Sequence, residues 1–285
     1  MNAAVIVLYR PDRRRLDENI DAIKGQVDKI ILVDNGADGS GELASMAGRC
    51  NAAYIDNGGN KGIAHAMNRA VEYCLEHGYS WLLTLDQDSV CPQGIMEKYR
   101  EFQSFDKVAV ITCAINYNNK ELQEDGKERF CYLKECITSA SFIHIGVCRE
   151  VGGFDEAMFI DRVDFEYCYR IRQAGYKILR ANEVILSHQL GELEIVDAAF
   201  KKLHVGNHSA VRKYYMAQNL VYCTRKHAGL YSKPYCFYKL LVLMGKTIVF
   251  ETDKAAKSKA ILEGVKQGMG MKVSEDDWIK VKIAG

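Results

Sequence analysis

The chain has 285 residues, of which 48% are apolar and 26% are charged, and its formal net charge is +1. This composition is typical of a soluble globular protein with one large domain, or with one domain and a helical extension. The balanced charge excludes a global electrostatic attraction to nucleic acid, so we expect no nucleic-acid partner.

Cysteine usage and hydropathy bear on the compartment of the protein. The ten cysteines include no Cys-x-x-Cys pair, and the apolar start at 3–9 is too short for a secretory signal and runs into the basic stretch 10–15. We therefore expect reduced cysteines in a cytoplasmic protein. No apolar run approaches the roughly 18 residues of a spanning helix. The nearest, residues 235–250, is interrupted by Lys239 and Lys246 and is either a core helix or a helix on a membrane surface.

Strands and helices alternate along the first half of the sequence. Apolar runs predict the strands, and apolar residues at helical spacing predict the helices, with Gly78 ending the third helix. The expected strands are 3–9, 28–36, 52–60, 80–89 and 107–115, and the expected helices are 16–26, 42–47, 61–78 and 93–103. Continuous apolar strands between helices predict a parallel sheet that is covered on both faces.

The second half is less regular. We expect a loop or hairpin tip at 118–129, followed by two short strands, or a strand and the start of a helix, within 131–151. A helix is expected over 159–175 and an extended segment over 176–189. Beyond residue 206 the pattern predicts helices near 209–228, 234–251 and 255–269.

Polar residues follow each of the first four predicted strands. They are Tyr9 and Arg10, then Asp34 and Asn35, then Asn57 to Asn60, and finally Asp86 to Asp88. Ligands of parallel α/β sheets bind at the carboxyl ends of the strands. A crevice lined by Asp34, Asn60 and Asp86 suits a ligand with several hydrogen-bonding groups, such as a nucleoside. Each of these positions, taken alone, is also explained as an ordinary polar turn.

Asp86 and Asp88 bracket Gln87 at the end of the fourth strand. Two carboxylates one residue apart repel each other unless a cation lies beside them, and their oxygens suit Mg²⁺ or Mn²⁺. One Asp-x-Asp is expected by chance in a chain of this length, so the motif depends on its surroundings. Upstream, a glycine turn opens the helix after residue 60, where Lys61 would face an anion and Asn68 the crevice. A plain helix cap explains that turn equally well.

A second acidic cluster contains Asp161, Asp164 and Glu166, at the start of a predicted helix. Carboxylates at this position either complement the helix dipole or include a general base for an acceptor hydroxyl. His188 follows an extended segment and is either structural or an additional metal contact.

Taken in order, these motifs resemble glycosyltransferase family 2, the inverting nucleotide-sugar enzymes of GT-A fold, and in particular its rhamnosyltransferase-like branch. The matching segments are 33–36, 57–68, 82–89, 152–178, 187–192 and 212–227. The resemblance implies an α/β, Rossmann-like, mostly parallel sheet flanked by helices, with a helical C-terminal extension. It also implies a catalytic domain over 1–205, with a nucleotide-sugar half at about 1–115 and an acceptor half at about 116–205, and a helical region over 206–285 packed on it.

The resemblance also assigns roles to residues. Asp164 would be the catalytic base, and Asp88, Asp86 and His188 would hold a divalent cation, Mn²⁺ or Mg²⁺. Acceptor or diphosphate contacts would come from Asp161, Glu166, Arg212 and Tyr215. Donor binding would involve Tyr9, Asp34, Asn35, Asn60, Lys61, Asn68, Asp86 and Gln87. The partners implied are a dTDP-, UDP- or GDP-linked sugar and a saccharide or lipid-linked acceptor, with membrane contact through the C-terminal helices.

The sequence departs from the family pattern at Arg10, Ala140, Val163 and Gln218. The last replaces a frequent arginine, whose loss would weaken a phosphate contact to the donor. Two other functions fit some of the residues. One is a haloacid dehalogenase-like phosphatase with Asp86 as its nucleophile, and the other is a nucleotide-sugar-binding protein without catalysis.

Overall fold

The computed structural model describes residues 1–36, 40–117, 128–188, 193–198, 201–227 and 229–273. These residues form two compact units. The first comprises the described parts of 1–157 and 163–189, and the second comprises 158–162 and the described residues beyond 190.

The first unit is built on one eight-stranded sheet with the strand order β3-β2-β1-β4-β7-β5-β8-β6. The strands are β1 (Asn2–Leu8), β2 (Lys29–Asp34), β3 (Ala53–Asp56), β4 (Trp81–Asp86), β5 (Val108–Tyr117), β6 (Phe130–Leu133), β7 (Ser141–His144) and β8 (Lys177–His188). Strands β1 to β4 are parallel to one another, and β5 is parallel to β8. β7 runs antiparallel between β4 and β5, and β6 runs antiparallel to β8. The sheet is therefore mixed but mostly parallel, which confirms the predicted class.

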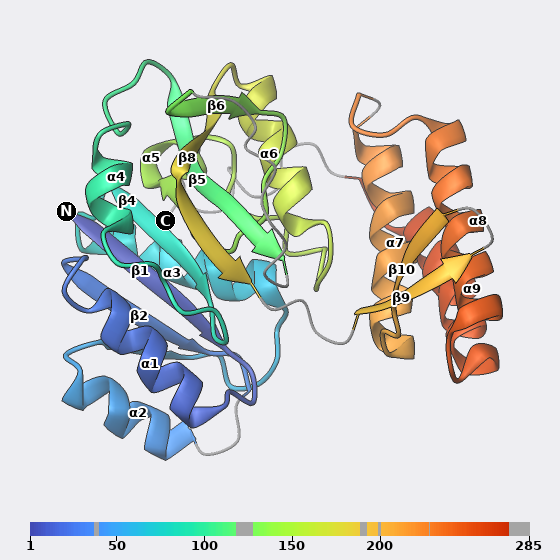
Figure 1. Cartoon of the computed structure of the whole chain (residues 1–285), viewed down its shortest axis with the longest axis horizontal. Coiled ribbons are helices and arrows are strands. Elements are labelled where there is room, and N and C mark those ends of the chain that lie inside the picture. Colours follow the sequence, from blue (N-terminus) through green and yellow to red (C-terminus); the bar gives the residue numbers. More distant parts are fainter. Residues whose placement is uncertain (37–39, 118–127, 189–192, 199–200, 228, 274–285) are drawn as a thin grey trace. The chain divides into compact units, whose positions relative to one another are not determined.

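Six helices are described in this unit, and they flank the sheet in Figure 1. They are α1 (Arg13–Ile23), α2 (Ser40–Arg49), α3 (Ile63–Glu76), α4 (Ile95–Arg100), α5 (Ile145–Glu150) and α6 (Val163–Gln173). Helix α1 begins where the Asp12 carboxylate accepts a hydrogen bond from the Arg15 N–H, and it buries Leu16, Ile20 and Ile23 as its apolar spacing predicts. Gly78, with φ of 72°, follows α3 in the left-handed conformation that commonly ends a helix.

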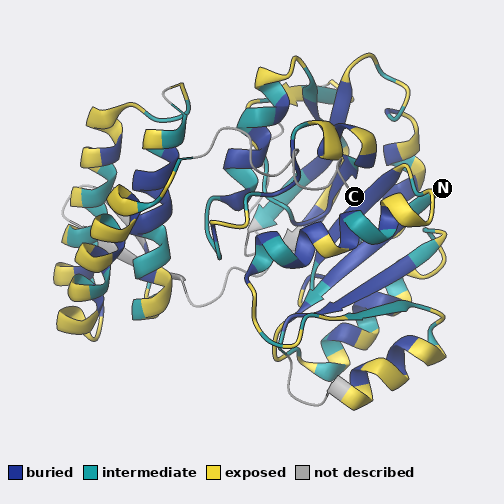
Figure 2. Ribbon diagram, turned by 180° about the vertical axis from the view of Figure 1, so that it is seen from behind, coloured by how far each residue is buried: buried dark blue, intermediate teal, exposed yellow. Residues whose placement is uncertain are grey.

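The core lies between the sheet and its helices, and Figure 2 shows the strands of its centre as buried. Ile6, Leu32 and Leu83 come from three neighbouring strands and are fully buried. Tyr99 and Phe142 stack nearby with ring centroids 5.9 Å apart, and the Tyr99 hydroxyl donates to the Ala140 carbonyl oxygen at 2.7 Å. This hydrogen bond ties α4 to the loop before β7.

The second unit contains a hairpin of β9 (Leu193–Ala198) and β10 (Lys201–Gly206), and helices α7 (Ala210–Lys226), α8 (Lys233–Phe250) and α9 (Lys254–Gly270). All three predicted C-terminal helices are confirmed within a few residues. The hairpin was not anticipated from the sequence. Helix α9 lies close against α7 because Gly264 and Gly268 carry no side chain there: a Cβ at Gly264 would lie 2.2 Å from the Tyr214 carbonyl oxygen.

Candidate functional site

Strand register brings the four predicted polar strand ends to one edge of the sheet. Leu8 pairs with Asp34, Asp34 pairs with Asp56, and Val7 pairs with Asp86. The first four strands therefore stop at nearly the same level. The turns that follow them form one continuous polar edge, where α/β sheets bind their ligands.

Asp34 is fully buried at this edge, and its carboxylate is held by the protein. The Tyr54 hydroxyl donates to Oδ2 at 2.6 Å, and the Gly36 N–H donates to Oδ1 at 3.1 Å. Gly36 has φ of 91°, and a Cβ at this position would lie 2.9 Å from the Asn60 backbone nitrogen. Only glycine allows the turn after β2 to approach the 57–62 loop so closely.

Asn35 connects that turn to the glycine-rich loop. Its Nδ2 donates to Asn60 Oδ1 at 3.1 Å, and its Oδ1 accepts the Lys61 N–H at 3.0 Å and Asn57 Nδ2 at 3.2 Å. Asn60 Oδ1 also accepts the Gly62 N–H at 3.0 Å. These two asparagines shape the loop, while the Lys61 side chain is exposed and available to an anion.

Gln87 joins the end of β4 to the end of β1. Its Oε1 accepts the Tyr9 N–H at 2.8 Å, and its Nε2 donates to the Tyr9 carbonyl oxygen at 3.0 Å. The Tyr9 side chain is 44% exposed, with the Arg10 guanidinium 5.5 Å from its ring centroid. Gln87 thus fixes the backbone of Tyr9, whose ring is exposed at this edge of the sheet. A direct contact between the Gln87 side chain and a nucleotide-sugar donor would compete with these two hydrogen bonds. Buried Asn19, which the sequence did not single out, adds a 2.9 Å hydrogen bond to the Asp86 carbonyl oxygen.

The two carboxylates of the Asp-x-Asp motif have different surroundings. Asp86 is half-buried, and its carboxylate accepts a hydrogen bond from the buried Ser139 hydroxyl. Asp88 is exposed, with the Ser89 hydroxyl 3.5 Å from its Oδ1. One carboxylate is oriented by the protein and the other faces solvent, a donor set of hard oxygens that suits Mg²⁺ or Mn²⁺.

Within the described residues, no three His, Cys, Asp or Glu side chains converge in a way that would hold a metal ion by themselves. His188 is the last residue of β8 and pairs with Tyr117 through the backbone, and its side chain lies outside what the structure describes.

Asp164 lies in the first turn of α6 and is half-buried. Its Oδ1 accepts the Phe165 N–H at 2.9 Å. It borders a small hollow whose other walls include Cys136, Thr138 and Tyr167. The other residues that line this hollow are uncharged, and the hollow lies beside the loop that precedes β7.

The loop at 136–140 contains the main site residue that the sequence does not single out. Its Ser139 donates to Asp86, and its Cys136 lies 3.7 Å, sulfur to sulfur, from Cys168 on α6. Ala140 holds φ of 53°, a left-handed conformation that is unfavourable for alanine. The loop thus reaches from the Asp-x-Asp motif to the helix that carries Asp164. The unusual Ala140 drew attention to this loop in the sequence, but no local signal points to Ser139.

Two residues that the sequence predicted to contact a ligand, Asn68 and Glu166, are buried and hydrogen-bonded within the protein. Asn68 is fully buried, donates to the Phe154 carbonyl oxygen and to Glu156, and accepts the Phe154 N–H, each at 2.8 Å. Glu166 is also fully buried, and Arg170 donates to both of its oxygens at 2.8 to 3.0 Å. Asn68 therefore holds the Phe154 backbone and Glu166 holds the Arg170 side chain, and a direct ligand contact would require these bonds to break.

In the second unit, Asp161 and Arg162 have φ of 75° and 62°, two consecutive left-handed residues. The Asn219 amide donates to the Ile160 and Asp161 carbonyl oxygens at 2.8 Å each, which stabilises this turn. Burial raises the pKa of Asp161, and the positive charges of Arg162 and Arg212 oppose that rise. Tyr215 stacks on Phe159 with ring centroids 4.9 Å apart, and Arg212 is exposed. Arg212 is therefore near enough to Asp161 for their charges to interact, and Tyr215 packs on Phe159, two residues before Asp161.

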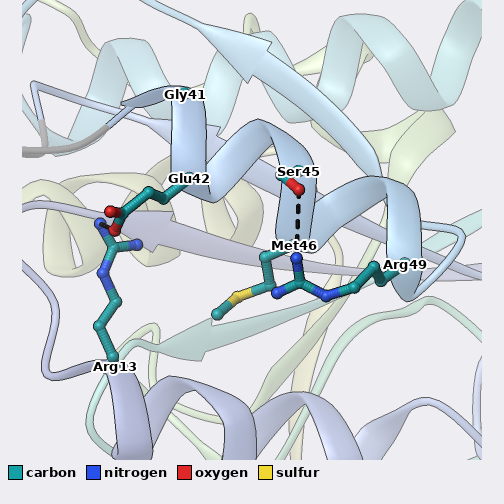
Figure 3. A pocket seen from close by; sticks show the side chains of 6 residues that line it. All are labelled: Arg13, Gly41, Glu42, Ser45, Met46 and Arg49. Atoms are coloured by element: carbon teal, nitrogen blue, oxygen red, sulfur yellow. Dashed lines mark hydrogen bonds and ion pairs between the residues drawn. The ribbon is translucent and has the colours of Figure 1, made fainter.

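A separate hollow lies between α1 and α2 (Figure 3). Arg13 and Glu42 form an ion pair of 3.6 Å across it, and the Arg49 guanidinium donates to the Ser45 hydroxyl at 3.1 Å. None of the predicted donor, metal or catalytic residues lines this hollow. It is distinct from the polar edge of the sheet.

Similar proteins identify the family of the chain. Residues 4–151, just over half of the sequence, match the model of glycosyl transferase family 2. Over 242 residues the chain is 26% identical to the dTDP-rhamnosyl transferase RfbF of Shigella flexneri. The aligned region covers 79% of this chain and 80% of that protein.

Solved structures share the fold. The mannosyltransferase PcManGT from Pyrobaculum calidifontis, in complex with GDP-Man and Mn²⁺, matches 95% of this chain and 75% of its own, with a TM-score of 0.56 and 13% identity. GalNAc-T7 with UDP, GalNAc and Mn²⁺ matches 95% of this chain and 56% of its own, with a TM-score of 0.62 and 13% identity. The family match leaves no support for the phosphatase alternative. The chain belongs to glycosyl transferase family 2 and is a glycosyltransferase with a GT-A-like fold.

Proposed function

We propose that this enzyme transfers a sugar, with inversion, from a nucleotide-diphosphate donor to a hydroxyl group of a saccharide or lipid-linked saccharide. The observation that carries the proposal is the loop at 136–140. It contacts Asp86 through Ser139 and borders the hollow beside Asp164. The proposed metal-binding motif and the proposed carboxylate base would thereby be connected through one short segment.

The nucleotide would bind along the polar edge of the sheet. The exposed Tyr9 ring offers a surface for stacking. The Asp34 carboxylate, oriented by Tyr54 and Gly36, would accept a hydrogen bond from an N–H of the base. Lys61 would approach the diphosphate. The similarity to a dTDP-rhamnosyl transferase favours dTDP-rhamnose, with UDP- and GDP-sugars as the alternatives to be tested.

Asp88 and Asp86 would hold a divalent cation, with His188 as a further contact. When bound, Mn²⁺ or Mg²⁺ neutralises negative charge on the diphosphate leaving group. Ser139 would keep the Asp86 carboxylate in one orientation. The Mn²⁺ ions in the structures of PcManGT and GalNAc-T7 are consistent with this assignment.

Asp164 would act as the general base. As the acceptor hydroxyl attacks the anomeric carbon, its proton moves to the carboxylate of Asp164. The new glycosidic bond forms on the face opposite the departing nucleoside diphosphate, whose bond to the anomeric carbon breaks. A single displacement of this kind inverts the anomeric configuration and needs no protein nucleophile. Asp161, Arg212 and Tyr215 remain proposed acceptor or diphosphate contacts, in a cytoplasmic enzyme of surface polysaccharide synthesis.

A donor panel with matched variants tests this function. The wild-type enzyme is incubated with Mn²⁺ and dTDP-, UDP- or GDP-sugars, and release of the nucleoside diphosphate is measured with and without a saccharide acceptor. Asp164→Asn should keep donor-induced thermal stabilisation and lose transfer by about 10²-fold or more. Asp106→Asn, at a carboxylate with 83% side-chain exposure, is the matched control and should behave as wild type. Full transfer by Asp164→Asn would show that another group is the base.

A further inference from the structure

Helix α8 exposes an apolar face along its whole length. Its sequence from Lys233 to Phe250 contains no acidic residue, yet only Cys236 and Thr247 are buried. The large side chains that are more than half exposed are Phe237 (65%), Tyr238 (59%), Leu241 (56%), Ile248 (51%) and Val249 (60%). Helix α8 lies within the second unit in Figure 1, and Figure 2 colours much of it as exposed.

These five side chains share one side of the helix. At 3.6 residues per turn they project within an arc of roughly 120°. Cys236 and Thr247 lie on the opposite side, and Cys236 packs there against Leu220 and Val221 of α7. The inward side, where Leu240 also packs, is apolar as well, so α8 is apolar on both sides, unlike an ordinary surface helix with a polar outer face.

Lysines border this apolar face. With the same helical periodicity, Lys233 projects on one flank and Lys239 and Lys246 project on the other. Long lysine stems lie along apolar surface while the ammonium groups reach water or phosphate. The Lys239 ammonium lies 5.3 Å from the ring centroid of Tyr235, so this lysine lies next to an aromatic side chain of the same helix.

We propose that this face of α8 inserts into the surface of an anionic lipid bilayer. An apolar face flanked by lysines is the pattern of helices that lie in the membrane interface. A second copy of the chain fits less well, because pairing α8 with itself brings lysines together without a carboxylate on the helix to neutralise them. Among the described residues, no helix is long and apolar enough to cross a bilayer. The inference concerns a binding surface and stands apart from the transfer reaction.

Vesicle sedimentation tests this proposal. The full chain should sediment with phosphatidylcholine vesicles that contain phosphatidylglycerol and remain in solution with phosphatidylcholine alone. Phe237→Gln/Leu241→Gln should weaken the binding by at least about tenfold, since two apolar groups no longer leave water. The control Leu75→Gln/Ile185→Gln alters two exposed apolar residues of the first unit and should bind as wild type. Lys239→Gln/Lys246→Gln should weaken binding and reduce its dependence on salt.

A second readout does not depend on the double variants folding. Tyr238→Trp places a reporter on the apolar face, and its fluorescence should shift to shorter wavelength when anionic vesicles are added. The proposal is overturned if the wild type fails to bind, or if binding survives Phe237→Gln/Leu241→Gln in folded protein. It is also overturned if this variant instead dissociates a dimer that forms without lipid, because the face would then join two chains.

Discussion

Among single residues, burial separates side chains that stabilise the enzyme from those that we propose contact substrate. Glu166 and Asp164 are two residues apart in α6, yet Glu166 is fully buried and Asp164 is half-buried. Arg170, which holds Glu166, also donates to the Val151 and Gly153 carbonyl oxygens. The pair therefore fixes the 151–153 turn against α6.

Glu166→Gln should lower the free energy of unfolding by about 3 kcal/mol, because it leaves the Arg170 charge without its buried partner. Chemical denaturation measures this loss. The control Glu18→Gln removes surface ion pairs with Arg14, at the same helical spacing, and with Arg15, and should change stability by less than about 0.5 kcal/mol. Unchanged stability together with a raised acceptor KM would instead make Glu166 an acceptor contact.

Ser139→Ala removes the hydroxyl that orients Asp86. We expect the affinity for Mn²⁺ in the presence of a nucleoside diphosphate to fall by about tenfold, as is typical when the partner of a metal ligand is lost. Calorimetric titration measures this affinity, with the exposed Ser104→Ala as the control. Equal Mn²⁺ affinities of Ser139→Ala and the wild type would argue against Asp86 as a ligand.

Asp161 links charge to stability. Because burial raises its pKa, the ionised form that dominates at neutral pH is unfavourable in the folded state. Stability from this group is complete below the unfolded pKa of about 3.9 and is lost as pH rises through the higher folded pKa. Asp161→Asn, which tolerates the same positive φ, should therefore be more stable than wild type at pH 7, by a margin that shrinks toward pH 4. Denaturation across this pH range checks the sign, and a less stable variant at pH 7 would mean that Arg162 and Arg212 outweigh burial.

At the scale of elements, close packing of α7 and α9 depends on two glycines. A Cβ at Gly268 would lie 2.4 Å from the Gln218 carbonyl oxygen, and one at Gly264 would be even closer to Tyr214. Gly264→Ala should lower the stability of the fold by roughly 1 to 3 kcal/mol, since backbone must move to make room. Gly245→Ala in α8 meets no atom within 4 Å and should raise stability by about 0.5 to 1 kcal/mol through helix propensity. Thermal melting measures the stability of both variants. A Gly264→Ala variant as stable as the wild type would contradict the close approach of α9 to α7 at this position.

The elements also show what the sequence could predict. Strands β2 and β4 were predictable because continuous apolar runs end in Asp34 and Asp86, each followed by turn residues, which are local signals. The antiparallel insertion of β7 between β4 and β5 was not, because pairing between distant strands leaves no mark in either one. The same holds for Ser139 and Asp86, which are 53 residues apart. Glu166 and Arg170 have the spacing of a surface ion pair, and only packing shows that they are buried.

At the scale of the whole molecule, each unit contributes a different property. The first carries the Asp-x-Asp motif, Asp164 and the polar edge of the sheet. The second carries Arg212, Tyr215 and the exposed face of α8. Catalytic chemistry and the proposed membrane contact can therefore be altered separately, and Phe237→Gln/Leu241→Gln should leave transfer to a water-soluble acceptor unchanged.

The most direct test of the proposed site is calorimetric titration of dTDP-rhamnose, with and without Mn²⁺, into wild type, Asp88→Asn and Asp164→Asn. We predict that Mn²⁺ strengthens donor binding by the wild type and by Asp164→Asn, and that Asp88→Asn loses this Mn²⁺-dependent gain. If dTDP-rhamnose fails to bind, the UDP- and GDP-sugars are titrated in the same way. Mn²⁺-dependent binding of any of these donors that is equal in Asp88→Asn and the wild type would contradict the proposed metal site.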